Sequence, residues 1–242
     1  MELSLKDKTL LITGGTSRLG QAFVRKAAEQ GARVFFTYFR SSSIARELEG
    51  CGAQCFSLDL ADMRAIDAFV AEFEKKTGKL DILIHNAATF ANSLIEKMTE
   101  KQWDDVLGVN LKAPFYLTQK LLPLLTRKVP SKVFMLISRT GLTGLAGASN
   151  YAASKGGMIA MTKTLAKELG RKKILVNGVN PGFMKSTMTG SLSEKTLQRN
   201  LEESLLRSFS DPGEVADFLV YLCSDRMRQV TGQVFHFESR PF

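Results

Sequence analysis

Short apolar runs alternate with amphipathic stretches along almost the whole chain, and this alternation constrains the fold more than any other feature. The apolar runs are rich in Val, Ile and Phe and are mostly continuous, which is typical of strands buried on both faces of a sheet. We expect strands at 9–13, 33–38, 54–58, 81–85, 132–138, 174–179 and 233–237, and helices near 20–30, 43–50, 62–77, 99–125, 150–169 and 213–224.

Strands and helices that alternate in this way form βαβ units. The prediction is therefore an α/β fold: a doubly wound, Rossmann-like parallel sheet of about seven strands with helices on both faces. No linker or repeat divides the chain, so we expect a single domain over 1–242 that binds its ligand beyond the carboxyl ends of the strands. Thr99 with Gln102 fits a capping box, and Asp211-Pro212 fits a helix start.

Composition excludes several classes of function. No apolar stretch reaches the roughly 18 residues of a membrane span, and the start lacks the layout of a signal peptide. The cysteines form no CxxC pair and the chain has 2 histidines, so we expect no disulfide framework, no metal site and a cytoplasmic location. The net charge of +9 favours an acidic or phosphate-bearing partner, but no nucleic-acid-binding motif occurs, so neither nucleic acid nor membrane is an expected partner.

The stretch TGGTSRLG at 13–20 follows the first expected strand and precedes the first expected helix. Glycine-rich turns in this position bind phosphate through free N–H groups at the helix N-terminus. The glycines are Gly14, Gly15 and Gly20 rather than GxGxxG, so a plain tight turn is the alternative.

The second expected strand leads into FRSSS, which holds no acidic residue to bind a ribose 2′-hydroxyl. Arg40 and Ser41 suit a 2′-phosphate, although a solvated loop that caps the next helix explains the serines equally well. NADP(H) is therefore favoured over NAD(H).

Tyr151 and Lys155 are four residues apart on an expected helix and so share a face. Ser138 ends a strand upstream, and the glycine-rich segment between them allows these parts to meet. A nearby ammonium lowers the pKa of a phenol from about 10, and a serine hydroxyl can hold a substrate oxygen. Tyr and Lys with this spacing are commonly only surface neighbours. In this order, behind a nucleotide-binding turn, the set indicates a phenol that transfers a proton beside a bound substrate oxygen.

These motifs resemble those of the short-chain dehydrogenase/reductase family over essentially the whole chain. The motifs on which the resemblance rests are TGGTSRLG, DL at 59–60, HNAA at 85–88, VN at 109–110, Ser138, YAASK at 151–155 and NPGF at 180–183. NSLIEKMTEKQWDDVLGVNL, NPGFMKSTM and DPGEVADFLVYLCSD are most similar to 3-oxoacyl-[acyl-carrier-protein] reductases.

The resemblance implies that Tyr151 protonates a ketone while NADPH supplies hydride. Lys155 would hold the nicotinamide ribose and lower the Tyr151 pKa, and Ser138 would orient the carbonyl. Asn110 would anchor a water that links Lys155 to solvent; the alternative is a helix-kink residue that bonds its own backbone. The implied cofactor contacts are Gly14, Thr16, Ser17, Arg18, Leu19, Gly20, Arg40, Ser41, Asp59, Leu60, Asn86, Ala87, Ala88, Tyr151, Lys155, Pro181, Gly182, Met184 and Ser186.

The implied reaction is reduction of 3-oxoacyl to 3-hydroxyacyl chains on acyl carrier protein, or as another acyl thioester, in fatty acid synthesis. The alternatives are reduction of another carbonyl (a polyketide, sugar or small ketone) and a non-catalytic binding protein on the same scaffold. Residues 186–210 are expected to form a substrate lid or an ordinary amphipathic helix. Basic residues at the mouth would contact the acidic carrier, unless they only complement helix C-termini; they are Arg127, Lys128, Arg171, Lys172 and Lys173. A homotetramer, or else a dimer, is expected.

Four positions depart from the family pattern. Arg18 replaces a glycine, at a cost of about 1 kcal/mol or more if the turn is left-handed there, unless its guanidinium pairs with a cofactor phosphate. Ala88 replaces another glycine, and His85 replaces an asparagine and is expected to be a hydrogen-bonded core residue. The ending FHFESRPF lacks the common Asp-Gly-Gly.

Overall fold

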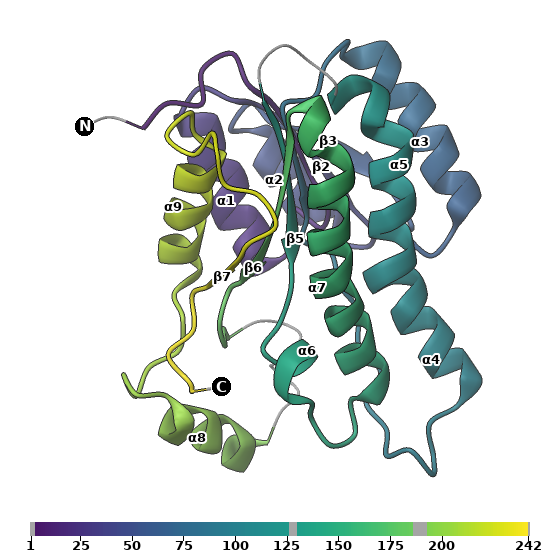
Figure 1. Cartoon of the computed structure of the whole chain (residues 1–242), viewed down its shortest axis with the longest axis vertical. Coiled ribbons are helices and arrows are strands. Elements are labelled where there is room, and N and C mark those ends of the chain that lie inside the picture. Colours follow the sequence, from purple (N-terminus) through teal and green to yellow (C-terminus); the bar gives the residue numbers. More distant parts are fainter. Residues whose placement is uncertain (1–2, 126–129, 186–192, 242) are drawn as a thin grey trace.

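The computed structural model describes residues 3–125, 130–185 and 193–241, and a seven-stranded parallel sheet forms its centre (Figure 1). The order is β3-β2-β1-β4-β5-β6-β7, so the direction of winding reverses between β1 and β4. This confirms the predicted doubly wound sheet. The strands are β1 (Thr9–Ile12), β2 (Arg33–Tyr38), β3 (Gln54–Ser57), β4 (Ile82–His85), β5 (Ser131–Leu136), β6 (Ile174–Asn180) and β7 (Val234–His236).

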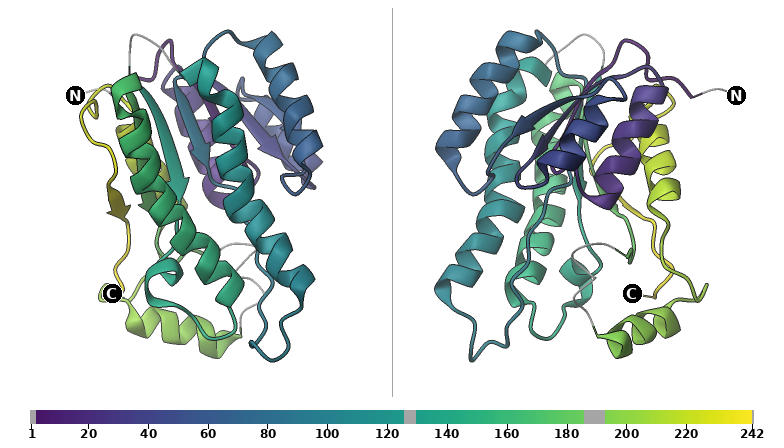
Figure 2. Two further views of the ribbon diagram at one scale, coloured as in Figure 1. Left: turned by 45° about the vertical axis from the view of Figure 1, so that its right-hand side comes forward. Right: turned by 180° about the vertical axis from the view of Figure 1, so that it is seen from behind.

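Helices cover both faces of the sheet (Figures 1 and 2). One face carries α1 (Arg18–Glu29), α2 (Ser42–Glu49) and α9 (Pro212–Cys223). The other carries α3 (Met63–Lys76), α5 (Ala113–Leu125) and α7 (Ser149–Leu169), which ends in the 3-10 turn η2 (Gly170–Lys172). Beyond the carboxyl ends of the strands lie α4 (Glu100–Leu107), α6 (Thr140–Thr143) and α8 (Glu194–Glu203), at the bottom of Figure 1.

The strands supply two hydrophobic cores, because alternate side chains point to opposite faces. On β1, Leu10 and Ile12 pack toward α1 and α9, whereas Leu11 packs toward α3 and α5. All three are fully buried. The continuous apolar runs therefore reflect a sheet covered on both sides.

The segment 99–125 differs from the single helix that was predicted. It begins as expected, with a capping box between Thr99 and Gln102. A π-helical turn, η1 (Gly108–Lys112), then separates α4 from α5. The prediction of one continuous α-helix was wrong at this point, where Asn110 lies.

Among the described residues, no helix is both long and apolar enough to cross a bilayer.

Candidate active site

The turn between β1 and α1 forms a tight cradle for an anion. Ser17 is the N-cap of α1 and accepts a hydrogen bond from Gly20 N at 3.1 Å. A Cβ on Gly20 would lie 2.5 Å from the Gly14 oxygen, so only glycine allows this approach. The amides of Arg18 and Leu19 open the helix and have no intrahelical acceptor, which leaves them available to a phosphate. The turn therefore fits the pyrophosphate of a dinucleotide.

Arg18 occupies the first position of α1 and does not have a positive φ. The backbone cost considered for a left-handed residue therefore does not arise. The Arg18 side chain is exposed, and its Nη1 donates to the Lys185 carbonyl at 3.3 Å. The guanidinium thus links the turn to the segment after β6, at the rim of the cradle.

Asn86, which follows β4, holds the turn in place. Its Nδ2 donates to the carbonyl oxygens of Thr13 and Gly14, both at 2.9 Å, and to Ser17 Oγ at 3.1 Å. Thr13 completes the junction, because its Oγ1 accepts from the amides of Asn86 and Ala87. Thr13 was not singled out from the sequence, although its place at the end of β1 was the available signal. Thr16 and Ala88 are partly buried beside this junction.

Arg40 and Ser41 follow β2, the strand next to β1. The Arg40 guanidinium is exposed and lies 5.0 Å from the Phe39 ring centroid. Ser41 is the N-cap of α2, but its side chain makes no capping bond. Its hydroxyl is therefore not committed to the helix, which favours the phosphate-binding role over the capping role.

Asp59 and Leu60 follow β3, the next strand outward. Asp59 Oδ1 accepts from Ala61 N at 2.9 Å, and the Leu60 side chain is 8% exposed within the core. Local backbone at this position is thus well fixed, and Leu60 can present little side-chain surface to an adenine.

Tyr151, Lys155 and Ser138 come together at the carboxyl ends of β5 and β6. Tyr151 lies in the first turn of α7, and the Ser138 hydroxyl is near enough to its phenol to lower the phenol's pKa. Lys155 Nζ lies 5.7 Å from the Tyr151 ring centroid and donates to the Leu136 carbonyl at 2.6 Å. The two side chains therefore share one site, as their spacing predicted.

The pKa values in this site are set mainly by burial. Burial raises the pKa of Tyr151, and the hydrogen bond from Ser138 opposes this increase. Burial lowers the pKa of Lys155 to about 8. The expected lowering of the Tyr151 pKa by Lys155 is thus not found in the protein alone, because burial dominates and Lys155 is not among the groups that shift this pKa. The phenol is protonated at neutral pH and can act as an acid.

Asn110 anchors the first half of α7 rather than its own helix. Its Oδ1 accepts from Thr89 N at 2.8 Å, and its Nδ2 donates to Thr89 O at 2.9 Å and to Ser154 Oγ at 3.2 Å. The alternative in which Asn110 bonds its own backbone was therefore wrong. Sequence reasoning missed Thr89 and Ser154, since nothing local marks them as partners of residue 110.

The segment after β6 lies beside the cradle. Gly182 has φ +76°, and a Cβ there would lie 2.3 Å from the Phe237 oxygen. Pro181 and Met184 are partly buried, and Met184 packs against the core beneath α1 and α9. Ser186 and the start of the predicted lid, 186–192, lie outside the described residues.

His85 is a core residue, as expected. It is 2% exposed, and its Nε2 lies 2.8 Å from Thr118 Oγ1. Burial lowers the pKa of His85 to about 3, so the ring is neutral at physiological pH.

The basic residues expected near the mouth are not placed there. Arg171 and Lys172 form η2, at the end of α7 opposite to Tyr151, and Lys173 follows. Because a helix rises about 1.5 Å per residue, roughly 30 Å separates Tyr151 from Arg171. The prediction that these basic residues lie near the opening of the active site of the same chain was therefore wrong. Arg127 and Lys128 lie outside the described residues.

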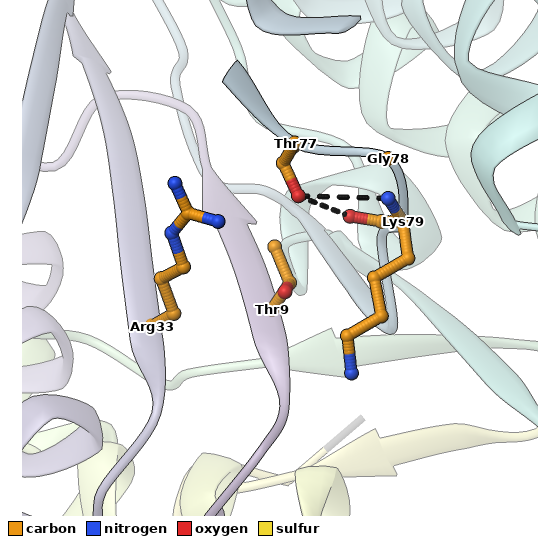
Figure 3. Close-up of a pocket in the computed structure, with 5 residues that line it drawn as sticks. All are labelled: Thr9, Arg33, Thr77, Gly78 and Lys79. Atoms are coloured by element: carbon orange, nitrogen blue, oxygen red, sulfur yellow. Dashed lines mark hydrogen bonds between the residues drawn. The ribbon is translucent and has the colours of Figure 1, made fainter.

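A pocket of about 370 Å³ also lies at the amino ends of the strands (Figure 3). It is lined by Thr9, Arg33, Thr77, Gly78 and Lys79. Lys79 already pairs with Asp81 at 3.1 Å, and Arg33 donates to the Lys76 carbonyl at 3.0 Å. Because doubly wound folds bind ligands at the opposite edge, this pocket does not compete with the site at Tyr151.

Known proteins match this chain over nearly its whole length. The profile of a family described as "Enoyl-(Acyl carrier protein) reductase" matches residues 15–239. The 3-oxoacyl-[acyl-carrier-protein] reductase FabG of Thermotoga maritima is 37% identical over 237 residues, which cover 96% of each chain. FabG of Aquifex aeolicus is 35% identical over 242 residues, which cover 98% of each.

A solved structure gives the same result. The Pseudomonas aeruginosa RhlG/NADP active-site complex has a TM-score of 0.92 and 27% sequence identity, over 99% of this chain and 98% of that chain. Fold, site geometry and sequence relatives agree. The chain belongs to the short-chain dehydrogenase/reductase family of oxidoreductases.

Proposed function

We propose that this protein reduces 3-oxoacyl thioesters to 3-hydroxyacyl thioesters with NADPH, and that its substrate is carried by acyl carrier protein in fatty acid synthesis. The observation that supports it most is the placement of the Ser138 hydroxyl near enough to the Tyr151 phenol to affect its pKa, beside a buried Lys155. The relatives from T. maritima and A. aeolicus are named as reductases of this kind.

Each residue of the site has a separate role in the reduction of the carbonyl group. The turn from Gly14 to Gly20 would hold the dinucleotide, and a nicotinamide bound there would supply the hydride for the carbonyl carbon. The Ser138 hydroxyl donates to the carbonyl oxygen and holds it beside the Tyr151 phenol, which transfers its proton to that oxygen. The Lys155 ammonium stabilises the resulting phenolate. The wider π turn at Asn110 suits an inserted water through which a proton returns from solvent.

The preference for NADPH rests on charge around the cradle. The end of β2 presents Arg40 and Ser41 and no carboxylate, so a 2′-phosphate is favoured over a free 2′-hydroxyl. Arg18, which is exposed at the rim of the cradle, adds a second guanidinium that favours an anionic ligand. RhlG, a structural neighbour, is described as an NADP complex.

We propose that the protein assembles as a homotetramer, or else as a dimer. Arg171, Lys172 and Lys173 are exposed but lie far from Tyr151 of the same chain, so they are not part of the proposed carrier-binding surface.

The test follows NADPH oxidation with acetoacetyl thioesters, both free and bound to acyl carrier protein. We expect the carrier-bound substrate to react best, in a salt-sensitive manner because the carrier is acidic. Tyr151→Phe should lose at least about a hundredfold in kcat, since general acid catalysis contributes about 10²–10⁴-fold. Tyr221→Phe, an exposed tyrosine on α9, is the matched control and should behave as wild type.

Two results would contradict the proposal. Preferential reduction of a crotonyl thioester would favour a carbon–carbon double bond as the substrate, as the family description suggests. Equal use of small ketones would favour a general carbonyl reductase.

A further inference from the structure

The C-terminal tail, residues 237–241, folds back over the catalytic end of its own chain. Figure 1 shows the C-terminus between α6 and α8. The tail enters this position from β7, where Phe237 N donates to Asn180 O at 2.8 Å. Phe237 then passes against the Gly182 turn, which leaves no space for a Cβ. The tail is thus in contact with the segment after β6.

The next contact is a buried ion pair within the tail. The side chains of Glu238 and Arg240 are only 2% and 11% exposed, and Arg240 Nη2 lies 2.7 Å from Glu238 Oε2. The same guanidinium donates to Asn200 Oδ1 on α8 and lies 5.1 Å from the Phe183 ring centroid. Arg240 therefore joins the tail, α8 and the segment after β6.

Backbone and hydroxyl groups strengthen the link to α8. Ser239 Oγ lies 2.7 Å from Ser204 Oγ, at the end of this helix. Leu205 N donates to the Ser239 carbonyl at 3.0 Å. Ser239 thus holds the C-terminal end of α8 through both its hydroxyl and its carbonyl.

Arg139 makes the connection to the catalytic side. It follows Ser138 directly, and its Nε and Nη2 donate to the Pro241 carbonyl at 3.0 and 2.8 Å. Its Nη1 lies 3.6 Å from Glu203 Oε2 on α8. Two N–H groups of the planar Arg139 guanidinium thus donate to the same carbonyl oxygen, which fixes the direction of this side chain.

We propose that residues 238–241 are a positioning segment of the active site, which fixes α8 and the loop of Ser138 relative to each other through Arg240 and Arg139. This inference rests on the proposed function. The tail touches no reacting atom; it acts by holding the Ser138 hydroxyl opposite Tyr151 while α8 flanks the same end of the sheet. The charged C-terminal ending stands where the family commonly has Asp-Gly-Gly, and in this proposal it positions the active site.

The test compares Arg139→Ala, a deletion of residues 238–242, and the two combined. Each single change should lower kcat/KM for the acetoacetyl thioester about tenfold, since a misplacement of about 1 Å costs up to a hundredfold, while NADPH affinity stays within about twofold. The combined variant should lose clearly less activity than the product of the two single losses, because both changes remove the contact between Arg139 and Pro241. Arg139→Lys, which keeps the charge toward Glu203, should recover part of the activity. Arg226→Ala, an exposed arginine beyond the end of α9, is the matched control.

Hydrogen exchange gives a readout that does not depend on the substrate. In both single variants, amides of 139–145 and of α8 should exchange faster, while those of β1 and β4 should not change. Unchanged exchange in 139–145 and α8, additive losses in the combination, or a parallel loss of NADPH affinity and kcat/KM would each overturn the inference. If the wild type does not reduce the thioester, the proposed function fails, and the exchange data alone decide whether the tail couples the two parts.

Discussion

Replacement of Gly141 is a direct way to move the loop of Ser138 away from α7, the helix that carries Tyr151 and Lys155. Gly141 lies in α6, just after Ser138, where α6 meets α7. A Cβ on Gly141 would lie 2.7 Å from Gly156 N and from the Lys155 carbonyl carbon. Nonbonded carbon atoms pack at about 3.5–4.0 Å, so Gly141→Ala must separate the two helices by roughly 0.8 Å. The obstacle is backbone on both sides, so no rotamer change can relieve it.

This separation changes the distance between the Ser138 hydroxyl and the Tyr151 phenol. Because a displacement of about 1 Å can cost about a hundredfold in rate, we expect kcat to fall by about ten- to a hundredfold. The cradle between β1 and α1 is not touched, so NADPH affinity should change little. Single-turnover NADPH oxidation measures the chemical step, and a fluorescence titration measures binding.

The matched control is Gly78→Ala, because a Cβ there meets nothing within 4 Å. It should leave rate and affinity unchanged. A Gly141→Ala enzyme with wild-type single-turnover rates would refute the reasoning, since it would mean that the Ser138 loop tolerates displacement from α7.

The remaining predictions concern charge and burial. Arg18→Gly should weaken NADPH binding about tenfold and leave NADH binding almost unchanged, because a hydrogen bond to a charged group contributes about 1.5–3 kcal/mol; tighter NADPH binding would mean that Arg18 obstructs the site. The pKa of Lys155 is lowered to about 8, so its ammonium is lost as the pH rises through 8, and the NADPH dissociation constant should increase above that pH in the wild type but not in Lys155→Met. The effect of this group on folding has the opposite sign: the unfolded chain keeps the proton up to the ordinary pKa of 10.5, so the Lys155 contribution to stability increases between pH 8 and 10.5. Thr118→Val removes the hydrogen-bond partner of buried His85 and should lower the free energy of unfolding by about 1–3 kcal/mol, measured by urea denaturation; an unchanged midpoint would contradict this.

Local sequence patterns predicted the elements of the fold because the sheet is buried on both faces. Each apolar run corresponds to a strand with ends within two residues of the expected ones. Helix starts could also be predicted, because their capping bonds join residues close in the sequence. At Asp211, for example, Oδ1 accepts from the amides of Gly213 and Glu214. Tyr151 and Lys155 were found for the same reason, since one helical turn fixes their relation.

Contacts between distant residues could not be predicted in this way. The π turn at Asn110 depends on Thr89 and Ser154, which lie in other segments. Arg139 contacts Pro241, about a hundred residues further along, and no periodic pattern marks either residue. Such contacts become visible only when the chain is folded.

The wrong prediction for the basic residues is a different case, because the predicted order of helices and strands already contained the information needed to avoid it. A helix that starts with Tyr151 at the carboxyl ends of the strands must end at their amino ends. Arg171, Lys172 and Lys173 follow that helix and therefore had to lie at the far edge of the sheet. Topology, applied to the predicted elements, would have corrected the expectation.

The first turns of α7 are held from three independent directions, which explains how a short helix segment can keep catalytic geometry. Asn110 holds Ser154 from the side of α4 and α5. The Leu136 carbonyl holds Lys155 from the end of β5. Gly141 of α6 packs closely against the backbone of Gly156 and holds the helix from the side of the Ser138 loop. Neighbouring residues of a helix point in different directions, so these three contacts fix both its rotation and its position. The loop of Ser138 packs against α7 through Gly141, and the tail contact through Arg139 that we propose links the same loop to α8 on its other side.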